Sequence, residues 1–106
     1  MNILEHNTGL KKEVIEKIQG CFAQFPEIEK VLLYGSRAKG NYRRGSDIDL
    51  CIVGKDASTD TVFKVSNQLD DLLLPYTFDL SIYHLLDNQN FIEHIDRVGV
   101  VFYEKP

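Results

Sequence analysis

The most restrictive feature of this sequence is residues 47–53 (Asp-Ile-Asp-Leu-Cys-Ile-Val), in which two aspartates alternate with apolar residues before the segment becomes wholly apolar. Successive side chains of a β-strand point to opposite faces. Ile48, Leu50 and Ile52 therefore share one face, which must be buried, while Asp47 and Asp49 leave from the other face. Strands of doubly wound parallel sheets are buried on both faces and are apolar throughout. The segment instead predicts a strand with one dry face and one wet face.

The rest of the chain alternates between helical and strand-like patterns. The predicted order is a helix (10–25), a strand (31–34), the strand at 47–53, a helix that begins at the capping candidates 58–60 and ends before Pro75, a strand (78–82), a helix that begins at Asp87 or Asn88 and ends at Gly99, and an apolar run (100–103). We therefore expect an α/β (α+β) fold, in which a small mixed sheet carries its helices on one face and leaves the other face open and wet.

Length, charge and cysteine content exclude several classes of protein. A chain of 106 residues corresponds to one small domain, so residues 1–106 are interpreted as a single unit. The net charge of -4 argues against direct nucleic-acid binding, which needs a broad cationic face. Two cysteines are too few for a disulfide framework or a metal knuckle. Neither a signal peptide nor a membrane-length apolar stretch is found, so we expect a cytoplasmic protein without a membrane partner.

Three aspartates are predicted to share the wet face of the sheet. Asp47 and Asp49 leave it from one strand, and Asp79 occupies the equivalent face of the strand at 78–82. Two unit charges roughly 6 Å apart repel by about 3 kcal/mol at an effective dielectric constant of about 20. Such a cluster is unfavourable unless water or a cation neutralises it, and carboxylates are the ligands that Mg²⁺ prefers. On this pattern alone, functionless solvent-facing aspartates remain an equal alternative.

A glycine-rich basic segment lies between the first two predicted strands. Residues 35–40 read Gly-Ser-Arg-Ala-Lys-Gly, and residues 36–46 hold four basic side chains and no acid. Because the whole chain has a charge of -4 and this segment +4, the remainder carries -8. Such a turn suits an anion beside a metal site, although an ordinary basic surface loop would look the same. A Walker A loop is excluded, because Asn41 and Tyr42 stand where that motif requires Lys and Ser or Thr.

Residues 35–40, residues 46–50 (Ser-Asp-Ile-Asp-Leu) and Asp79 together resemble the nucleotidyltransferase superfamily that includes DNA polymerase beta and the aminoglycoside nucleotidyltransferases. The chain is more similar still to the minimal nucleotidyltransferase (MNT) domains of prokaryotes. The resemblance extends from residue 31 to residue 101. It implies a polymerase beta palm-like fold and the transfer of a nucleoside monophosphate, AMP from ATP, to a hydroxyl group.

The resemblance also implies roles for individual residues. Gly35 and Ser36 would hold the nucleotide triphosphate, Asp47 and Asp49 would bind two Mg²⁺ ions, and Asp79 would complete one metal site and help to activate the acceptor hydroxyl. The family pattern assigns no phosphate contact to the basic residues. From charge alone, we add three candidate nucleotide-binding side chains, Arg37, Arg43 and Arg44.

Members of this minimal class commonly act as antitoxins of small helical HEPN toxins, in some cases by transferring AMP to a tyrosine of the toxin. The resemblance therefore implies a HEPN-type partner, within a homo- or hetero-oligomer, that is either substrate or completes the site. The alternative is a non-catalytic nucleotide-binding antitoxin that neutralises its partner by complex formation. Modification of a small drug is disfavoured, because 106 residues leave little room for a specific acceptor pocket.

Overall fold

Four strands form a mixed sheet in the computed structural model of the chain, which describes residues 8–106. The strands are β1 (Lys30–Tyr34), β2 (Ile48–Val53), β3 (Phe78–Ile82) and β4 (Val100–Glu104). They lie side by side in the order β3-β2-β1-β4. Strand β2 runs parallel to β3, whereas β1 runs antiparallel to both β2 and β4. The predicted mixed sheet is therefore confirmed.

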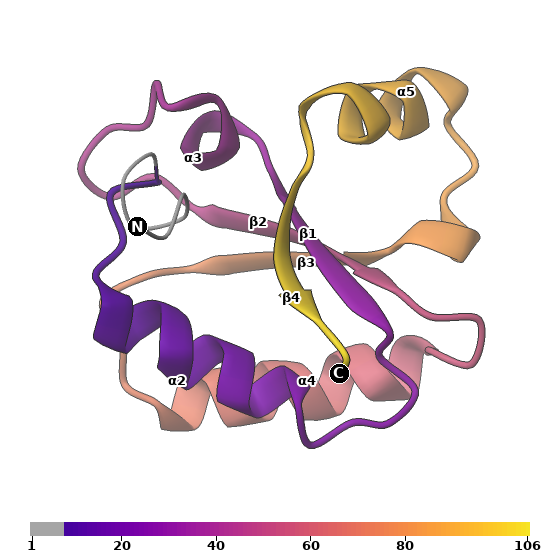
Figure 1. Cartoon of the computed structure of the whole chain (residues 1–106), viewed down its shortest axis with the longest axis horizontal. Helices are drawn as coiled ribbons and strands as arrows, with labels where there is room; N and C mark the ends of the chain where they lie inside the picture. The colour runs from indigo at the N-terminus through magenta and orange to yellow at the C-terminus, as the bar shows by residue number, and fades with distance from the viewer. Residues whose placement is uncertain (1–7) are drawn as a thin grey trace.

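Helices lie on both sides of this sheet (Figure 1). They are α2 (Lys12–Phe22), α3 (Ser36–Lys39), α4 (Thr59–Asp71) and α5 (Gln89–Val98), and a short 3-10 helix, η1 (Tyr83–Leu85), follows β3. In the view of Figure 1, α2 and α4 lie below the strands, whereas α3 and α5 lie above them. Of the helices that residues 8–106 form, none has the length and apolar character needed to cross a bilayer.

The main core lies between the sheet and the helix pair α2 and α4. The apolar set predicted for β2 faces this core, and each member is fully buried (Ile48, Leu50 and Ile52). The two helices contribute buried side chains at helical spacing (Ile15, Ile18 and Phe22 from α2; Val65 and Leu69 from α4). Burying one such side chain stabilises a fold by roughly 1.5–3 kcal/mol. This interface therefore holds the sheet in place and fixes which face of β2 is wet.

The predicted helix caps are largely as the sequence indicates. Ser58 and Thr61 form a capping box at the start of α4, in which each hydroxyl accepts a hydrogen bond from the other residue's backbone N–H. Asn88, rather than Asp87, caps α5, because its Oδ1 accepts a hydrogen bond from the Phe91 N–H at 3.1 Å. The two caps fix where α4 and α5 begin, and β3 lies between these two points in the chain.

Helix α2 is shorter than the predicted range of 10–25. It ends at Phe22, and the chain then tightens into shorter turns, with Gln24 N–H donating to Cys21 O and Phe25 N–H to Phe22 O. Phe25 is nevertheless buried, so it contributes to the apolar pattern without being helical. The apolar periodicity thus predicted the buried face of α2 correctly but placed the C-terminal end of the helix too late in the chain.

The second face of the sheet is not open along its whole length, which corrects the expectation that all helices share one side. A second apolar cluster forms there around Tyr34, Cys51 and Ile95, and residues of η1 and α5 pack against it. The apolar run at 31–34 is consistent with this, because β1 is apolar on both faces. Helix α5 therefore covers part of the face that carries the aspartates, and the remainder of that face is left for a site.

Candidate active site

The pairing of β2 with β3 brings the predicted aspartates together. In the parallel register, Asp49 is the direct partner of Asp79, and Ile48 is the partner of Phe78. Neighbouring strands lie about 4.8 Å apart, so the backbones of Asp49 and Asp79 are adjacent on one face. Asp47 lies two residues before Asp49, just outside β2, and has the same facing. Asp47 and Asp79 are exposed, whereas Asp49 is half-buried.

The crossover through α4 explains why Asp79 arrives at this position. Helix α4 lies between β2 and β3 in the chain and packs on the core face, so β3 returns parallel to β2. The N-terminal ends of β2 and β3 therefore lie next to each other. Each strand carries an aspartate as its second residue. The predicted convergence of Asp49 with Asp79 is therefore present in the structure.

The pKa of Asp49 is raised above its usual value. Burial is the largest cause, followed by the negative charges of Asp79 and Asp47. The apolar cluster around Tyr34 explains the burial, because Tyr34 is the cross-strand partner of Asp49 on β1 and its ring packs edge-on against Phe91 of α5. The carboxylates thus destabilise one another, and a positive charge in their midst would relieve this.

Tyr34 itself does not add charge to the site. Burial, together with the charges of Asp79 and Asp49, raises the pKa of its hydroxyl to about 12. The phenol therefore stays neutral at physiological pH. Tyr34 is buried and shields Asp49 from water on the side that faces β1.

A threonine that the sequence analysis did not single out contacts the first aspartate. The Thr77 hydroxyl donates a hydrogen bond to Asp47 Oδ1, and Ile48 N–H donates to Thr77 O at 2.9 Å. Thr77 precedes β3 as Asp47 precedes β2, so the two residues are neighbours only because the strands are parallel and in register. The sequence offers no signal for this contact until that register is known.

The Gly35–Ser36 turn lies directly against Asp49. Gly35 has φ 77° and ψ -157°, a combination that only glycine adopts without strain. A Cβ atom on Gly35 would overlap Asp49 Oδ2. The turn leads straight into α3, whose first backbone N–H groups have no partner within the helix. The structure thus places the turn that begins α3 against the Asp49 carboxylate.

Three of the four predicted basic side chains are accessible. Lys39, Arg43 and Arg44 are exposed, the last two in the loop between α3 and β2. Ser46 closes this loop into a turn, because its Oγ accepts from Arg43 N–H at 2.8 Å and its N–H donates to Arg43 O at 3.0 Å. The two arginines therefore lie within four residues of Asp47, where they are available to an anion.

Arg37 is placed differently from the sequence expectation. Its side chain is 3% exposed, and its guanidinium donates to the backbone carbonyls of Thr8 and Ser46. The rings of Tyr42 and Tyr76 lie against it. Because its hydrogen bonds go to the chain itself, we do not include Arg37 among the phosphate ligands proposed below. The sequence places it in a basic motif, but only the packing shows that it is enclosed.

The three aspartates form an open donor set rather than a closed metal cage. Among residues 8–106, no three His, Cys, Asp or Glu side chains are placed so that they could together hold a metal ion. Mg²⁺ is usually held by one or two carboxylates, with water and substrate phosphates completing its octahedron. The carboxylates suit such an ion by their chemistry, because Asp49 and Asp79 are direct partners in the register and because burial, with the charges of Asp79 and Asp47, raises the pKa of Asp49.

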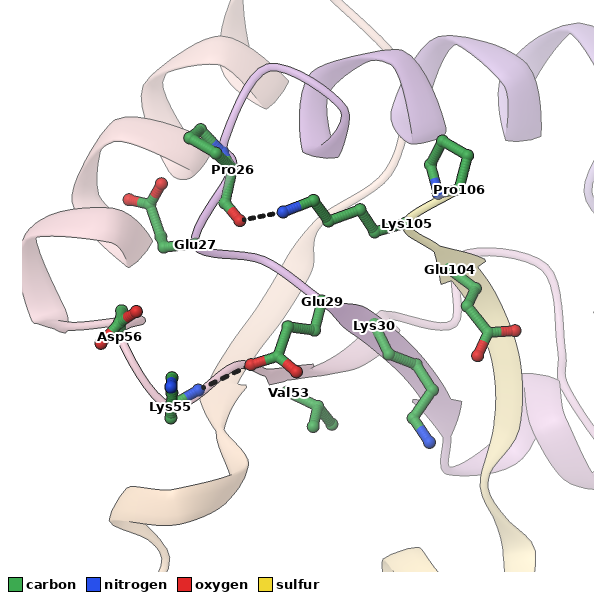
Figure 2. Close-up of a pocket in the computed structure, with 10 residues that line it drawn as sticks. All are labelled: Pro26, Glu27, Glu29, Lys30, Val53, Lys55, Asp56, Glu104, Lys105 and Pro106. Atoms are coloured by element: carbon green, nitrogen blue, oxygen red, sulfur yellow. Dashed lines mark hydrogen bonds between the residues drawn. The ribbon is translucent and has the colours of Figure 1, made fainter.

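A hollow of about 580 Å³ lies at the opposite end of the strands (Figure 2). It is formed where β1 begins and where β2 and β4 end, whereas the aspartates lie where β2 and β3 begin. Two of its charged side chains have backbone partners: Glu29 Oε2 accepts from Lys55 N–H at 3.1 Å, and Lys105 Nζ donates to Pro26 O at 3.0 Å. It contains none of the predicted site residues.

Comparison with known proteins places the chain in a family. The family model described as polymerase beta, nucleotidyltransferase, matches residues 16–106. A provisionally assigned protein adenylyltransferase of Methanocaldococcus jannaschii is 48% identical over 42 residues, which make up 38% of this chain and 34% of that protein. The aligned part therefore spans about one third of this curated relative.

Solved structures show the same fold. A crystal structure of a toxin-antitoxin complex with AMP-PNP contains a chain that matches with a TM-score of 0.68 and 20% identity, over 91% of this chain and 75% of that one. A structure of a tri-AMPylated Shewanella oneidensis HEPN toxin in complex with an MNT antitoxin matches with a TM-score of 0.59 and 14% identity, over 97% of this chain and 74% of that one. At these identities the likeness is one of fold.

We expect Gly35→Ala to destabilise the protein more than Gly45→Ala. Both glycines have positive φ, 77° and 84°, so each substitution introduces backbone strain of about 1–2 kcal/mol. A Cβ at Gly45 meets nothing within 4 Å, whereas one at Gly35 overlaps the Asp49 carboxylate. Urea unfolding of the two variants measures the difference. Equal losses of unfolding free energy would show that the turn does not contact Asp49.

We expect Asp49→Asn to stabilise the fold at pH 7. Because the pKa of Asp49 is raised in the folded state, that state binds the proton more tightly than the unfolded chain, and stability falls as pH rises from the usual value of 3.8 through the raised pKa. The gain should be on the order of 1 kcal/mol, since partly exposed charges are screened.

Urea unfolding at several pH values tests this, with Asp56→Asn, an exposed loop substitution, as the control. The advantage of Asp49→Asn should shrink as the pH is lowered through the raised pKa of Asp49 toward the usual value of 3.8, because the wild-type carboxyl then becomes protonated as well. A variant that is less stable than wild type at pH 7 would contradict the proposed repulsion.

Proposed function

Because the chain belongs to the polymerase beta nucleotidyltransferase family, we propose that it transfers AMP from ATP to a hydroxyl group on a HEPN-type partner protein. The observation that carries this proposal is the register that pairs Asp49 with Asp79, beside a glycine turn in contact with Asp49. An accessible basic loop adjoins these carboxylates. A protein that only bound nucleotide would have no need of the third acid.

The Gly35–Ser36 turn holds the triphosphate in this proposal. Gly35 has no side chain, so phosphate oxygens approach the backbone closely, and the unpaired N–H groups at the start of α3 donate to them. Arg43 and Arg44 add positive charge from the neighbouring loop. These contacts orient the α-phosphorus toward the aspartates.

Asp47, Asp49 and Asp79 would hold Mg²⁺, two ions by the family pattern, and this charge would offset that of the triphosphate and of the departing pyrophosphate. Thr77 fixes the orientation of the Asp47 carboxylate through its hydrogen bond. Asp79 accepts the proton of the acceptor hydroxyl. The hydroxyl oxygen then forms a bond to the α-phosphorus, the bond between the α-phosphorus and the bridging oxygen breaks, and pyrophosphate leaves.

The edge position of β3 favours a macromolecular acceptor. Strand β3 is the last strand of the sheet, and Asp79 is exposed on it. Within residues 8–106, no further strand pairs with the outer side of β3. A hydroxyl displayed on the surface of a partner reaches such an open site. The complexes among the structural neighbours, one of which contains an AMPylated HEPN toxin, support this choice.

Mass spectrometry of the co-expressed partner tests the proposal. With the wild-type chain, the partner should gain the mass of one or more AMP groups. Asp47→Asn and Asp79→Asn should each lower the extent of transfer by at least about 10²-fold, because the metal-binding and proton-accepting groups are lost. Asp87→Asn, an exposed substitution before α5, serves as the control.

Undiminished transfer by Asp47→Asn and Asp79→Asn would overturn the catalytic assignment. A tight complex in which wild-type chain leaves the partner unmodified would instead support neutralisation by complex formation alone.

We further expect Arg43→Ala/Arg44→Ala to weaken nucleotide binding. Removing two exposed cations beside the site should raise the Kd for AMP-PNP several-fold at low salt, and the difference from wild type should narrow as salt is added. Isothermal titration calorimetry measures both effects. The matched control, Lys12→Ala/Lys17→Ala, removes two exposed cations from α2, on the far side of the sheet. Unchanged affinity at low salt would remove these arginines from the site.

A further inference from the structure

Arg37 is an enclosed cation that the proposed mechanism does not use. Its side chain is 3% exposed, and among residues 8–106 it forms no ion pair with a carboxylate. Burying a charge is costly unless hydrogen bonds and neighbouring electron density compensate it. An arginine retained in such a place has a structural or functional task, and its contacts indicate which.

The guanidinium of Arg37 donates two hydrogen bonds to the backbone carbonyl of Ser46, the residue before Asp47. Arg37 Nε and Nη2 both donate to Ser46 O, at 3.2 and 3.1 Å, and Ser46 is the residue before Asp47. Nη1 donates to Thr8 O at 2.8 Å. A planar fork of donors makes these bonds at once, which a lysine ammonium does not reproduce. The backbone position of Asp47 is thereby tied to α3.

The two tyrosine rings connect the same guanidinium to further parts of the site. Arg37 Cζ lies 5.2 Å from the ring centroid of Tyr42 and 5.1 Å from that of Tyr76, within the range of cation–π attraction. Tyr42 belongs to the loop that carries the exposed arginines. Tyr76 precedes Thr77, the hydrogen-bond donor to Asp47, and lies three residues before Asp79.

We propose that Arg37 is a positioning residue that clamps together the three chain segments bearing the site: the Gly35–Ser36 turn, the loop ending at Asp47 and the segment leading to Asp79. Its own place on α3 supplies the first connection, Ser46 the second and Tyr76 the third. Arg37 therefore acts through Asp47 and its neighbours rather than on phosphate. The catalytic consequence rests on the proposed function, whereas the clamp itself does not.

Hydrogen exchange of the unliganded protein tests the clamp without any catalysis. Arg37→Lys keeps the charge but loses the fork, so backbone amides within residues 41–47 should exchange at least 10-fold faster than in wild type. Amides that pair β1 with β2, such as those around Leu33 and Leu50, should exchange as before. A general loss of stability would instead accelerate exchange throughout the sheet. Arg97→Lys, an exposed substitution on α5, is the matched control.

Tyr76 offers a second, milder variant in case Arg37→Lys does not fold. Tyr76→Leu removes the ring over the guanidinium and should also accelerate exchange within 41–47, whereas Tyr76→Phe keeps the ring and should not. The effects of Arg37→Lys and Tyr76→Leu should be less than additive, because both remove one clamp.

The transfer assay supplies the functional arm. At saturating ATP, Arg37→Lys should slow transfer at least 10-fold, since small displacements of a reacting group are costly. Unchanged exchange within 41–47 in both the arginine and the Tyr76→Leu variants would overturn the clamp, as would weaker AMP-PNP binding with unchanged exchange, the result expected of a direct phosphate ligand. If the loop loosens but the wild-type chain transfers nothing, the clamp stands and the proposed function fails.

Discussion

The parallel pairing of β2 with β3 is the constraint on which the candidate site depends. It sets Asp79 beside Asp49 and Thr77 beside Asp47, so four residues from two distant parts of the chain share one edge of the sheet. The pairing in turn depends on the helix between the strands. Helix α4 buries its apolar stripe against the core face, and that packing returns β3 in the same direction as β2. Core packing on one face therefore arranges chemistry on the other.

Repulsion among the site's carboxylates lowers the stability of the fold, and the packing of the rest of the protein must offset this loss. Burial and two neighbouring acids raise the pKa of Asp49, and Gly35 leaves just enough space for its carboxylate. The apolar cluster beneath α5 adds to the burial of Asp49, because its member Tyr34 is the cross-strand partner of Asp49. Stability is thus given up locally in a manner that a bound cation would recover.

The basic segment divides into two kinds of positive charge. Arg43 and Arg44 remain exposed beside the aspartates, whereas Arg37 is enclosed by carbonyls and tyrosine rings. The exposed cations suit a ligand that comes and goes, since water screens them until an anion arrives. The enclosed one suits a permanent connection, since its partners are part of the chain. The basic segment therefore supplies exposed cations for binding an anion and one enclosed cation that holds parts of the chain together.

The sequence alone determined which residues alternate, where helices are capped and which motif residues belong to the family, because periodicity, capping and motif spacing are local properties. The shared facing of Asp49 and Asp79 and the Gly35–Ser36 turn were predictable for that reason, whereas the roles of these residues stay predictions. Only the tertiary structure decided that α5 covers part of the second face, that Thr77 reaches Asp47, and that Arg37 is buried. Each of these depends on strand register or on packing between segments far apart in the chain, and no local pattern encodes which distant side chain will fill a given space.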